Sequence, residues 1–454
     1  MDYIPHAESQ IKFMMEKVGV KRLADLFDTI PRELLLDDER AKAILKSGAL
    51  ADNGMTELEL KNLLAGLASK NKAYKSIFQG AGSYWHYIPA VVDYLTSRGE
   101  LWTSYTPYQA ERSQGYLQAI FEYQSMIAAM TGMNFSNASL HDGATALVDA
   151  IVMAKSQNKD RDTVVIAGKI NPFYKTVVAT ALMPRDIKLI CVEPGKLAAS
   201  IDGSVMAIIA CSPDFFGTIH DVAAIVQATK QKDNSILVIQ CITEALSLAM
   251  LKSPGAAGVD IAVGEAQSLG IPMCFGGPAL GFLAVSDSKL LHKMPGRIVG
   301  CTKEVAGERL GFTLTLSARE QHIRREKALS NICSNEALNM LRAAIYMAAL
   351  GGTGLKQVAT INVKKANYLK AKLCEIKGFT CINEGPTFNE FVMKKKDTSI
   401  QKIIKSCESK DILGPLDLGT VNIEWKGLML FCATEMNESK AIDDLIASCK
   451  EGIA

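Results

Sequence analysis

Short apolar runs rich in valine and isoleucine recur along the middle of the chain. Each is four to six residues long, and several are separated by stretches of helical length. This length and this β-branched content favour strands over buried helices. Strands joined by helices form a largely parallel sheet that is buried on both faces, so the pattern predicts an α/β fold. The predicted strands are residues 163–167, 187–192, 206–211, 236–239, 260–263 and 281–285.

The N-terminal region predicts helices instead. Apolar residues recur there at helical spacing, as in Ile11, Met14 and Val18, with charged residues between them. We expect residues 1–70 to form an N-terminal helical arm, followed by a large domain at residues 71–330 that contains the sheet.

The C-terminal region predicts a second, smaller domain. The run 336–350 is typical of a helix, and the glycine pair Gly351-Gly352 that follows it is a common helix end. Helix-like and strand-like pieces come next, among them residues 390–393 and 428–431. We therefore expect residues 331–454 to form a small α+β domain.

Charge and cysteine content narrow the classes of function. The 454 residues include 50 Lys and Arg against 48 Asp and Glu, a net charge of +2. This balance does not favour nucleic acid or an anionic membrane as partner. No apolar run approaches the roughly 18 residues of a membrane helix. The 11 cysteines are scattered singly, so we expect no metal site, no disulfide framework and a cytoplasmic location.

The densest group of polar and aromatic residues lies at residues 80–89 and 105–115. Tyrosine hydroxyls, imidazoles and amides each need a partner when they are buried, so we expect these segments to lie outside the core. They form either a functional loop or an ordinary surface loop that ends at the cap of the next helix. The candidate residues are Tyr84, His86, Tyr105, Tyr108, Gln109, Glu111, Ser113 and Gln114.

Three further segments are candidates for ligand contact. Asp142-Gly-Ala-Thr145 precedes an apolar run, and the free N–H groups of a helix start can bind an anion, but an ordinary capped helix has the same sequence. Residues 211–217 and 264–281 follow predicted strands, where open parallel sheets often bind ligands. Neither contains a phosphate P-loop or a GxGxxG motif, and the alternative for each is a simple turn.

Several segments resemble the P-proteins of glycine decarboxylase. Tyr105-Thr-Pro-Tyr-Gln-Ala-Glu-Arg-Ser-Gln-Gly115 is similar to the family signature YTPYQPExSQG, with Ala110 in place of the usual proline. The resemblance implies the aspartate-aminotransferase-like fold, which is PLP (pyridoxal 5'-phosphate) fold type I, with a small C-terminal domain. Other matching segments follow in family order at residues 137–139, 142–145, 264–272, 275–278, 294–297 and 319–327, with weaker ones at 388–391 and 416–419.

The resemblance also implies a reaction and partners. P-proteins decarboxylate glycine on PLP and transfer the remaining aminomethyl group to the lipoyl group of H-protein. Single-chain members have roughly double this length and two homologous halves. By length, the chain resembles the alpha-type subunit, subunit 1, of the two-subunit form. Its expected partner is a beta-type subunit, in an α2β2 assembly.

The residues that hold PLP in such enzymes are missing from the expected positions. PLP is bound as a Schiff base to a lysine, and a carboxylate usually pairs with its pyridine nitrogen. Alignment with the family's lysine segment puts Gln267 at the lysine position, and no Lys or Arg occurs between Ser253 and Ser288. Residues 235–250 contain no Asp, only Glu244. The resemblance therefore implies that PLP is bound by the beta-type partner.

We expect this chain to complete the active site of its partner. The eight polar and aromatic candidates are carried over because they lie in or beside the matched segments. Two residues depart from the family pattern: Asp214 stands where Asn is frequent, and His141 precedes Asp142. Two alternatives remain open, a structural or regulatory subunit without PLP and a self-sufficient PLP enzyme of another specificity that uses a different lysine.

Overall fold

The computed structural model describes residues 6–36, 38–46, 54–102, 104–395 and 400–452. By its internal contacts the chain divides into two units, Met1–Ala73 and Tyr74–Ala454. The predicted division at residues 70 and 330 stays a prediction.

The first unit is helical. It contains α1 (Glu8–Val18), α2 (Asp38–Lys46) and α3 (Glu57–Ala68). α3 begins with a capping box in which the Thr56 hydroxyl accepts from the Glu59 N–H and the Glu59 carboxylate accepts from the Thr56 N–H. None of the described residues of this unit is buried. The side chains whose burial is described in these helices therefore form no core of their own.

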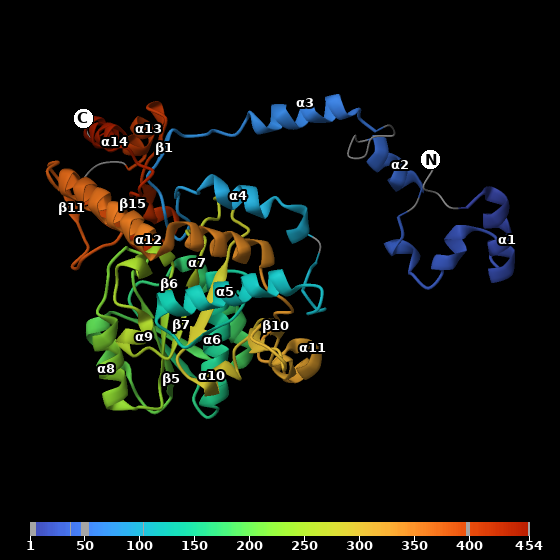
Figure 1. The fold of residues 1–454 in the computed structure, drawn as a ribbon. Coiled ribbons are helices and arrows are strands. Elements are labelled where there is room, and N and C mark those ends of the chain that lie inside the picture. Colours follow the sequence, from blue (N-terminus) through green and yellow to red (C-terminus); the bar gives the residue numbers. More distant parts are fainter. Residues whose placement is uncertain (1–5, 37, 47–53, 103, 396–399, 453–454) are drawn as a thin grey trace. The chain divides into compact units, whose positions relative to one another are not determined.

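A seven-stranded sheet is the centre of the second unit (Figure 1). Its strand order is β2-β8-β7-β6-β5-β3-β4. The pairs from β7 to β4 are parallel, whereas β8 and β2 are antiparallel at one edge. This confirms the predicted α/β fold with a mostly parallel sheet. The strands are β2 (Phe135–Ser136), β3 (Thr163–Ala167), β4 (Lys188–Val192), β5 (Val205–Cys211), β6 (Leu237–Ile242), β7 (Ile261–Glu265) and β8 (Gly281–Val285).

Helices cover both faces of this sheet because its strands are apolar on both sides. In β3, Val164 and Ile166 face one core cluster and Val165 and Ala167 face the other. α6 (Gly143–Gln157) and α7 (Pro172–Leu182) pack into the first cluster, and α5 (Gln114–Thr131), α8 (Val222–Lys232) and α12 (Ala337–Cys374) into the second. Shorter helices are α4 (Ala90–Thr96), α9 (Pro254–Ala257), α10 (Ser288–Leu291) and α11 (Gln321–Arg324).

The C-terminal part has a separate antiparallel sheet in the order β11-β12-β15-β14. A third core cluster lies between this sheet, the second half of α12 and the last two helices. The predicted helix end at Gly351 is a break inside α12, where Gly351 has φ 60° and helix resumes after it. The elements are β11 (Phe379–Cys381), β12 (Glu390–Lys395), α13 (Ile400–Ser409), β14 (Leu416–Asp417), β15 (Leu428–Cys432) and α14 (Ser439–Glu451).

Two smaller strand pairs complete the described structure. β1 (Ser76–Ile77) pairs in parallel with β13 (Ile412–Leu413). β9 (Val299–Lys303) and β10 (Leu310–Leu314) form an antiparallel hairpin. Within the described parts of the chain, no helix combines the length and the apolar character needed to span a membrane.

Gly217 allows the turn after β5 to lie directly against β12. Its φ is +84°, and a Cβ there would meet the carbonyl oxygen of Glu390 at 2.1 Å. We expect Gly217→Ala to lower the free energy of unfolding by about 2 kcal/mol or more, because an alanine is strained at this φ and has no room. Thermal melting monitored by circular dichroism measures the effect. Gly203→Ala is the control, since nothing lies within 4 Å of a Cβ there. Equal melting temperatures for the two variants would contradict the expectation.

Candidate active-site region

His86 lies between two carboxylates inside the second unit. Its Nε2 is 3.1 Å from Glu244 Oε2, and its Nδ1 is 2.9 Å from Glu435 Oε2. Glu244 follows β6 and Glu435 follows β15. Burial alone would lower the pKa of His86, but the two carboxylates outweigh it and raise this pKa from 6.5 to about 9. His86 is therefore an imidazolium at neutral pH.

Tyr84 is buried beside this group. Its hydroxyl donates to Glu390 Oε2 at 2.7 Å, and the Ala81 N–H donates to Glu390 Oε1 at 2.6 Å. Burial raises the pKa of Glu390 to about 7. The expectation that residues 80–89 lie outside the core is wrong for Tyr84 and His86. Carboxylates distant in sequence supply the partners that these polar groups need.

Gln267 follows β7, and its amide pairs with the backbone of Tyr84. The Tyr84 N–H donates to Gln267 Oε1 at 2.8 Å, and Gln267 Nε2 donates to the Tyr84 carbonyl oxygen at 3.0 Å. The same Nε2 also donates to the carbonyl oxygen of Ile271 at 2.7 Å. Gln267 is only 6% exposed. The side chain at the predicted lysine position thus holds the loop that carries Tyr84 and His86.

Glu265, the last residue of β7, lies at the start of α6. Its carboxylate accepts from the N–H groups of Gly143 at 3.1 Å, Gln267 at 3.0 Å and Leu280 at 2.8 Å. Burial raises the pKa of Glu265 to about 7, although these three bonds act in the opposite direction. A carboxyl group of the chain itself therefore occupies the helix start that the sequence offered as an anion site. Asp142 is the ordinary cap there and accepts from the Thr145 N–H at 2.7 Å.

The segment 105–111 exposes most of its side chains, although Thr106 and Pro107 are buried. Tyr105 and Tyr108 are 69% and 63% exposed, and Gln109 and Glu111 are exposed as well. The Tyr108 ring faces the guanidinium of Arg297, with 5.5 Å from the ring centroid to Cζ. Tyr105, Gln109 and Glu111 are thus accessible to another molecule, whereas one face of the Tyr108 ring is covered by Arg297.

Gln114 joins the same segment to the hairpin of β9 and β10. The Phe312 N–H donates to Gln114 Oε1 at 2.9 Å, and Gln114 Nε2 donates to the Phe312 carbonyl oxygen at 2.8 Å. Ser113 is the residue before α5, as predicted, but its side chain makes no capping hydrogen bond. The two residues thus lie at the base of the exposed segment and not at its tip.

The two departures from the family pattern have different environments. Asp214 is buried in the turn after β5, where it accepts from the N–H groups of Phe216 and Thr218 at 3.0 Å and contacts His220 Nε2 at 2.9 Å. Its role in this turn is structural. His141 is half exposed, and its Nε2 lies 3.9 Å from Glu336.

The structure therefore separates the eight candidates into two groups. Tyr84 and His86 are buried among carboxylates, and the other six lie in the segment before α5 or, for Gln114, at the first residue of that helix. Among the described residues, no hydrogen bond or ion pair joins the two groups. Sequence reasoning missed Glu265, Glu390 and Glu435. The signal for the first two was an acid at the end of the buried strand β7 and at the start of β12, directly before the apolar residues 391–393.

Comparison with solved structures defines the class of fold as PLP fold type I. Glutamate decarboxylase of Lactobacillus brevis has a TM-score of 0.66 and 12% identity, covering 89% of this chain and 93% of that one. A sphingosine-1-phosphate lyase of Burkholderia pseudomallei has a TM-score of 0.63 and 12% identity, with 89% and 92% covered. At such identities the likeness concerns the fold alone, and it confirms the predicted fold class.

Closer relatives define the family. An inhibitor-bound glycine decarboxylase (P-protein) of the glycine cleavage system has a TM-score of 0.85 and 37% identity, and each chain is covered completely. Relatives named probable glycine dehydrogenase (decarboxylating) subunit 1 are 43% identical in Desulforamulus reducens, over 98% of this chain and 99% of the relative, and 42% identical in Listeria monocytogenes, over 98% of both. The profile of the glycine cleavage system P-protein matches residues 1–448. The chain belongs to this family.

The charged state of His86 leads to a pH prediction. The pKa of His86 is raised from 6.5 to about 9 in the folded chain, so the charged imidazolium stabilises the folded state. Its contribution to the free energy of unfolding is on the order of 3 kcal/mol; it is complete below pH 6.5 and is lost as the pH rises through 9. NMR of ¹³C-labelled histidine should show one ring that titrates near pH 9, and His86→Asn should remove that signal. A His86 ring that titrates at or below pH 6.5 would contradict the assignment.

Proposed function

We propose that this chain is subunit 1 of a two-subunit glycine dehydrogenase (decarboxylating). The observation that carries the proposal is the match to relatives of that name, which extends over 98% of this chain and 99% of the relative. The reaction is the decarboxylation of glycine on PLP, with transfer of the aminomethyl group to the lipoyl group of H-protein. A beta-type subunit is the partner, in an α2β2 assembly, and the location is cytoplasmic.

In this proposal the beta-type partner binds PLP. The residues present in this chain do not fit the cofactor. Gln267 makes three backbone hydrogen bonds in place of a lysine. Glu265 brings a carboxyl group to the start of α6, where a phosphate would need free N–H groups. Glu244, the only acid of residues 235–250, faces His86.

The eight candidate residues then contribute to the partner's site in two ways. Tyr105, Tyr108, Gln109 and Glu111 are exposed and supply contacts in the assembly. Tyr84 and His86 are positioning residues, because their carboxylate partners fix the loop that carries them. Ser113 and Gln114 hold the base of the exposed segment. The alternatives are a purely structural subunit and a self-sufficient enzyme.

The site of cofactor attachment tests the proposal against the self-sufficient enzyme. We expect borohydride reduction of the co-expressed, PLP-loaded complex to leave pyridoxyl-lysine on the beta-type subunit and none at stoichiometric level on this chain. Tryptic mass spectrometry of the separated subunits measures the label. The same treatment of this chain alone is the control for surface lysines. A stoichiometric adduct on one lysine of this chain would refute the proposed division of labour.

Activity of the complex tests the exposed segment. We expect Tyr105→Phe and Gln109→Ala to lower glycine–bicarbonate exchange on the order of 10²-fold, because a positioned hydrogen-bonding group at a reacting site has about this effect. Assembly by size exclusion and the melting temperature should stay near wild type, since both side chains are exposed.

Matched controls separate this role from a general surface effect. Tyr94 is 67% exposed on α4 and Gln227 is exposed on α8. Tyr94→Phe and Gln227→Ala should keep full exchange activity. If Tyr105→Phe and Gln109→Ala also kept it in an intact complex, the chain would be a structural subunit, as the first alternative states.

A further inference from the structure

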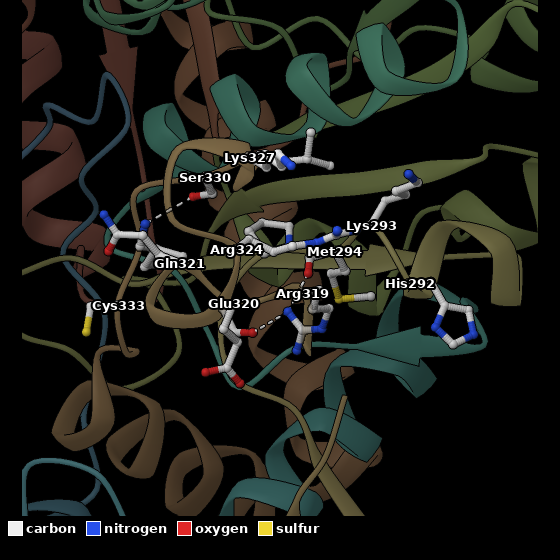
Figure 2. A pocket seen from close by; sticks show the side chains of 14 residues that line it. His292, Lys293, Met294, Arg319, Glu320, Gln321, Arg324, Lys327, Ser330 and Cys333 are labelled. Atoms are coloured by element: carbon white, nitrogen blue, oxygen red, sulfur yellow. Dashed lines mark hydrogen bonds between the residues drawn. The ribbon is translucent and has the colours of Figure 1, made fainter. Parts of the chain in front are cut away.

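A small cationic cavity lies beside α11 (Figure 2). Its volume is 90 Å³, and two segments line it, the one after α10 and the one around α11. Figure 2 shows four basic side chains around it, Lys293, Arg319, Arg324 and Lys327. The cavity lies within the second unit, and none of the eight candidate residues lines it.

Arg319 carries two hydrogen-bond donors without an acceptor. Its Nη1 donates to the carbonyl oxygens of Met294 and Gly296, which fixes the guanidinium at the wall of the cavity. Its Nε and Nη2 are buried and have no hydrogen-bond partner. Burial lowers the pKa of Arg319 to about 10, so the group is still a cation at neutral pH. Buried donors in native proteins are nearly always paired, so the two unpaired N–H groups of the Arg319 guanidinium indicate a ligand with acceptor oxygens.

The charges around the cavity are not balanced by the chain. Among the described residues, Lys293, Arg324 and Lys327 have no ion-pair partner. Of the residues that line the cavity, only Glu320 has a carboxylate, and this carboxylate pairs with Arg297 in a buried contact. The remaining cationic groups therefore favour an anion.

We propose that this cavity binds the phosphoryl group of a small phosphorylated ligand or free inorganic phosphate. A planar guanidinium edge binds two phosphate oxygens at once, and lysines add charge from the other sides. A volume of 90 Å³ admits the phosphoryl group itself and leaves any organic remainder outside. The proposal goes beyond the function proposed above and does not depend on it.

The cavity is also connected to the exposed segment 105–111. Glu320, next to Arg319 in sequence, pairs with Arg297, and Arg297 stacks on the Tyr108 ring. The ion pair and the stacking contact thus link the wall of the cavity to Tyr108.

Calorimetric titration of the full chain with inorganic phosphate, at constant ionic strength in chloride, tests the proposal. We expect saturable binding at one site. The double variant Arg324→Gln, Lys327→Gln should weaken it by about tenfold or more, because two charged donors are lost. This variant is preferred to a change at Arg319, which also holds two backbone carbonyls.

The control removes the same charge elsewhere. Lys402 on α13 and Lys440 on α14 are exposed, and Lys402→Gln, Lys440→Gln should leave phosphate affinity unchanged. Methyl phosphate distinguishes the sources of the ligand: tighter binding of inorganic phosphate supports the free ion, and equal or tighter binding of methyl phosphate supports a phosphate monoester. Absence of saturable binding, or equal affinities in the two double variants, would overturn the proposal.

Discussion

A buried imidazolium between two carboxylates joins three separate segments of the second unit. His86 belongs to the loop before α4, Glu244 follows a strand of the large sheet, and Glu435 follows a strand of the C-terminal sheet. Each carboxylate would be costly to bury alone, and so would the imidazole, but together they satisfy one another. The position of the loop that carries His86 depends on this contact, and Tyr84 in the same loop is held separately by Glu390 and Gln267.

Glutamine amides hold the backbone of one loop and of two strands in the second unit. Gln267 binds both the N–H and the C=O of Tyr84, and Gln114 does the same at Phe312. Gln124 on α5 repeats the arrangement at Val299, with bonds of 2.9 and 3.0 Å. Each amide makes the pair of hydrogen bonds to one residue's backbone N–H and C=O that a neighbouring strand would make in a sheet. Both strands of the hairpin formed by β9 and β10 are therefore fixed to one helix.

Local sequence patterns predicted the strands of the central sheet, but they did not predict which polar residues are buried. Apolar β-branched runs such as Thr163–Ala167 form the central strands because burial on two faces selects such residues. The glycine pair after the helical run marks a break in α12. The burial of Tyr84 and His86 could not be predicted, because their partners Glu390 and Glu435 lie more than 300 residues further along the chain. Sequence alone predicts a polar residue to be exposed, because its buried partner is not known.

The bonds of Gln267 also limit which side chain this position can accept. A lysine at this position would leave the N–H and C=O of Tyr84 without their side-chain partner, and it would meet a helix start still occupied by Glu265. The loop, the strand end and the helix start therefore depend on one another. The single substitution Gln267→Lys would lower stability, because the loop that carries Tyr84 and His86 would lose the side chain that holds it.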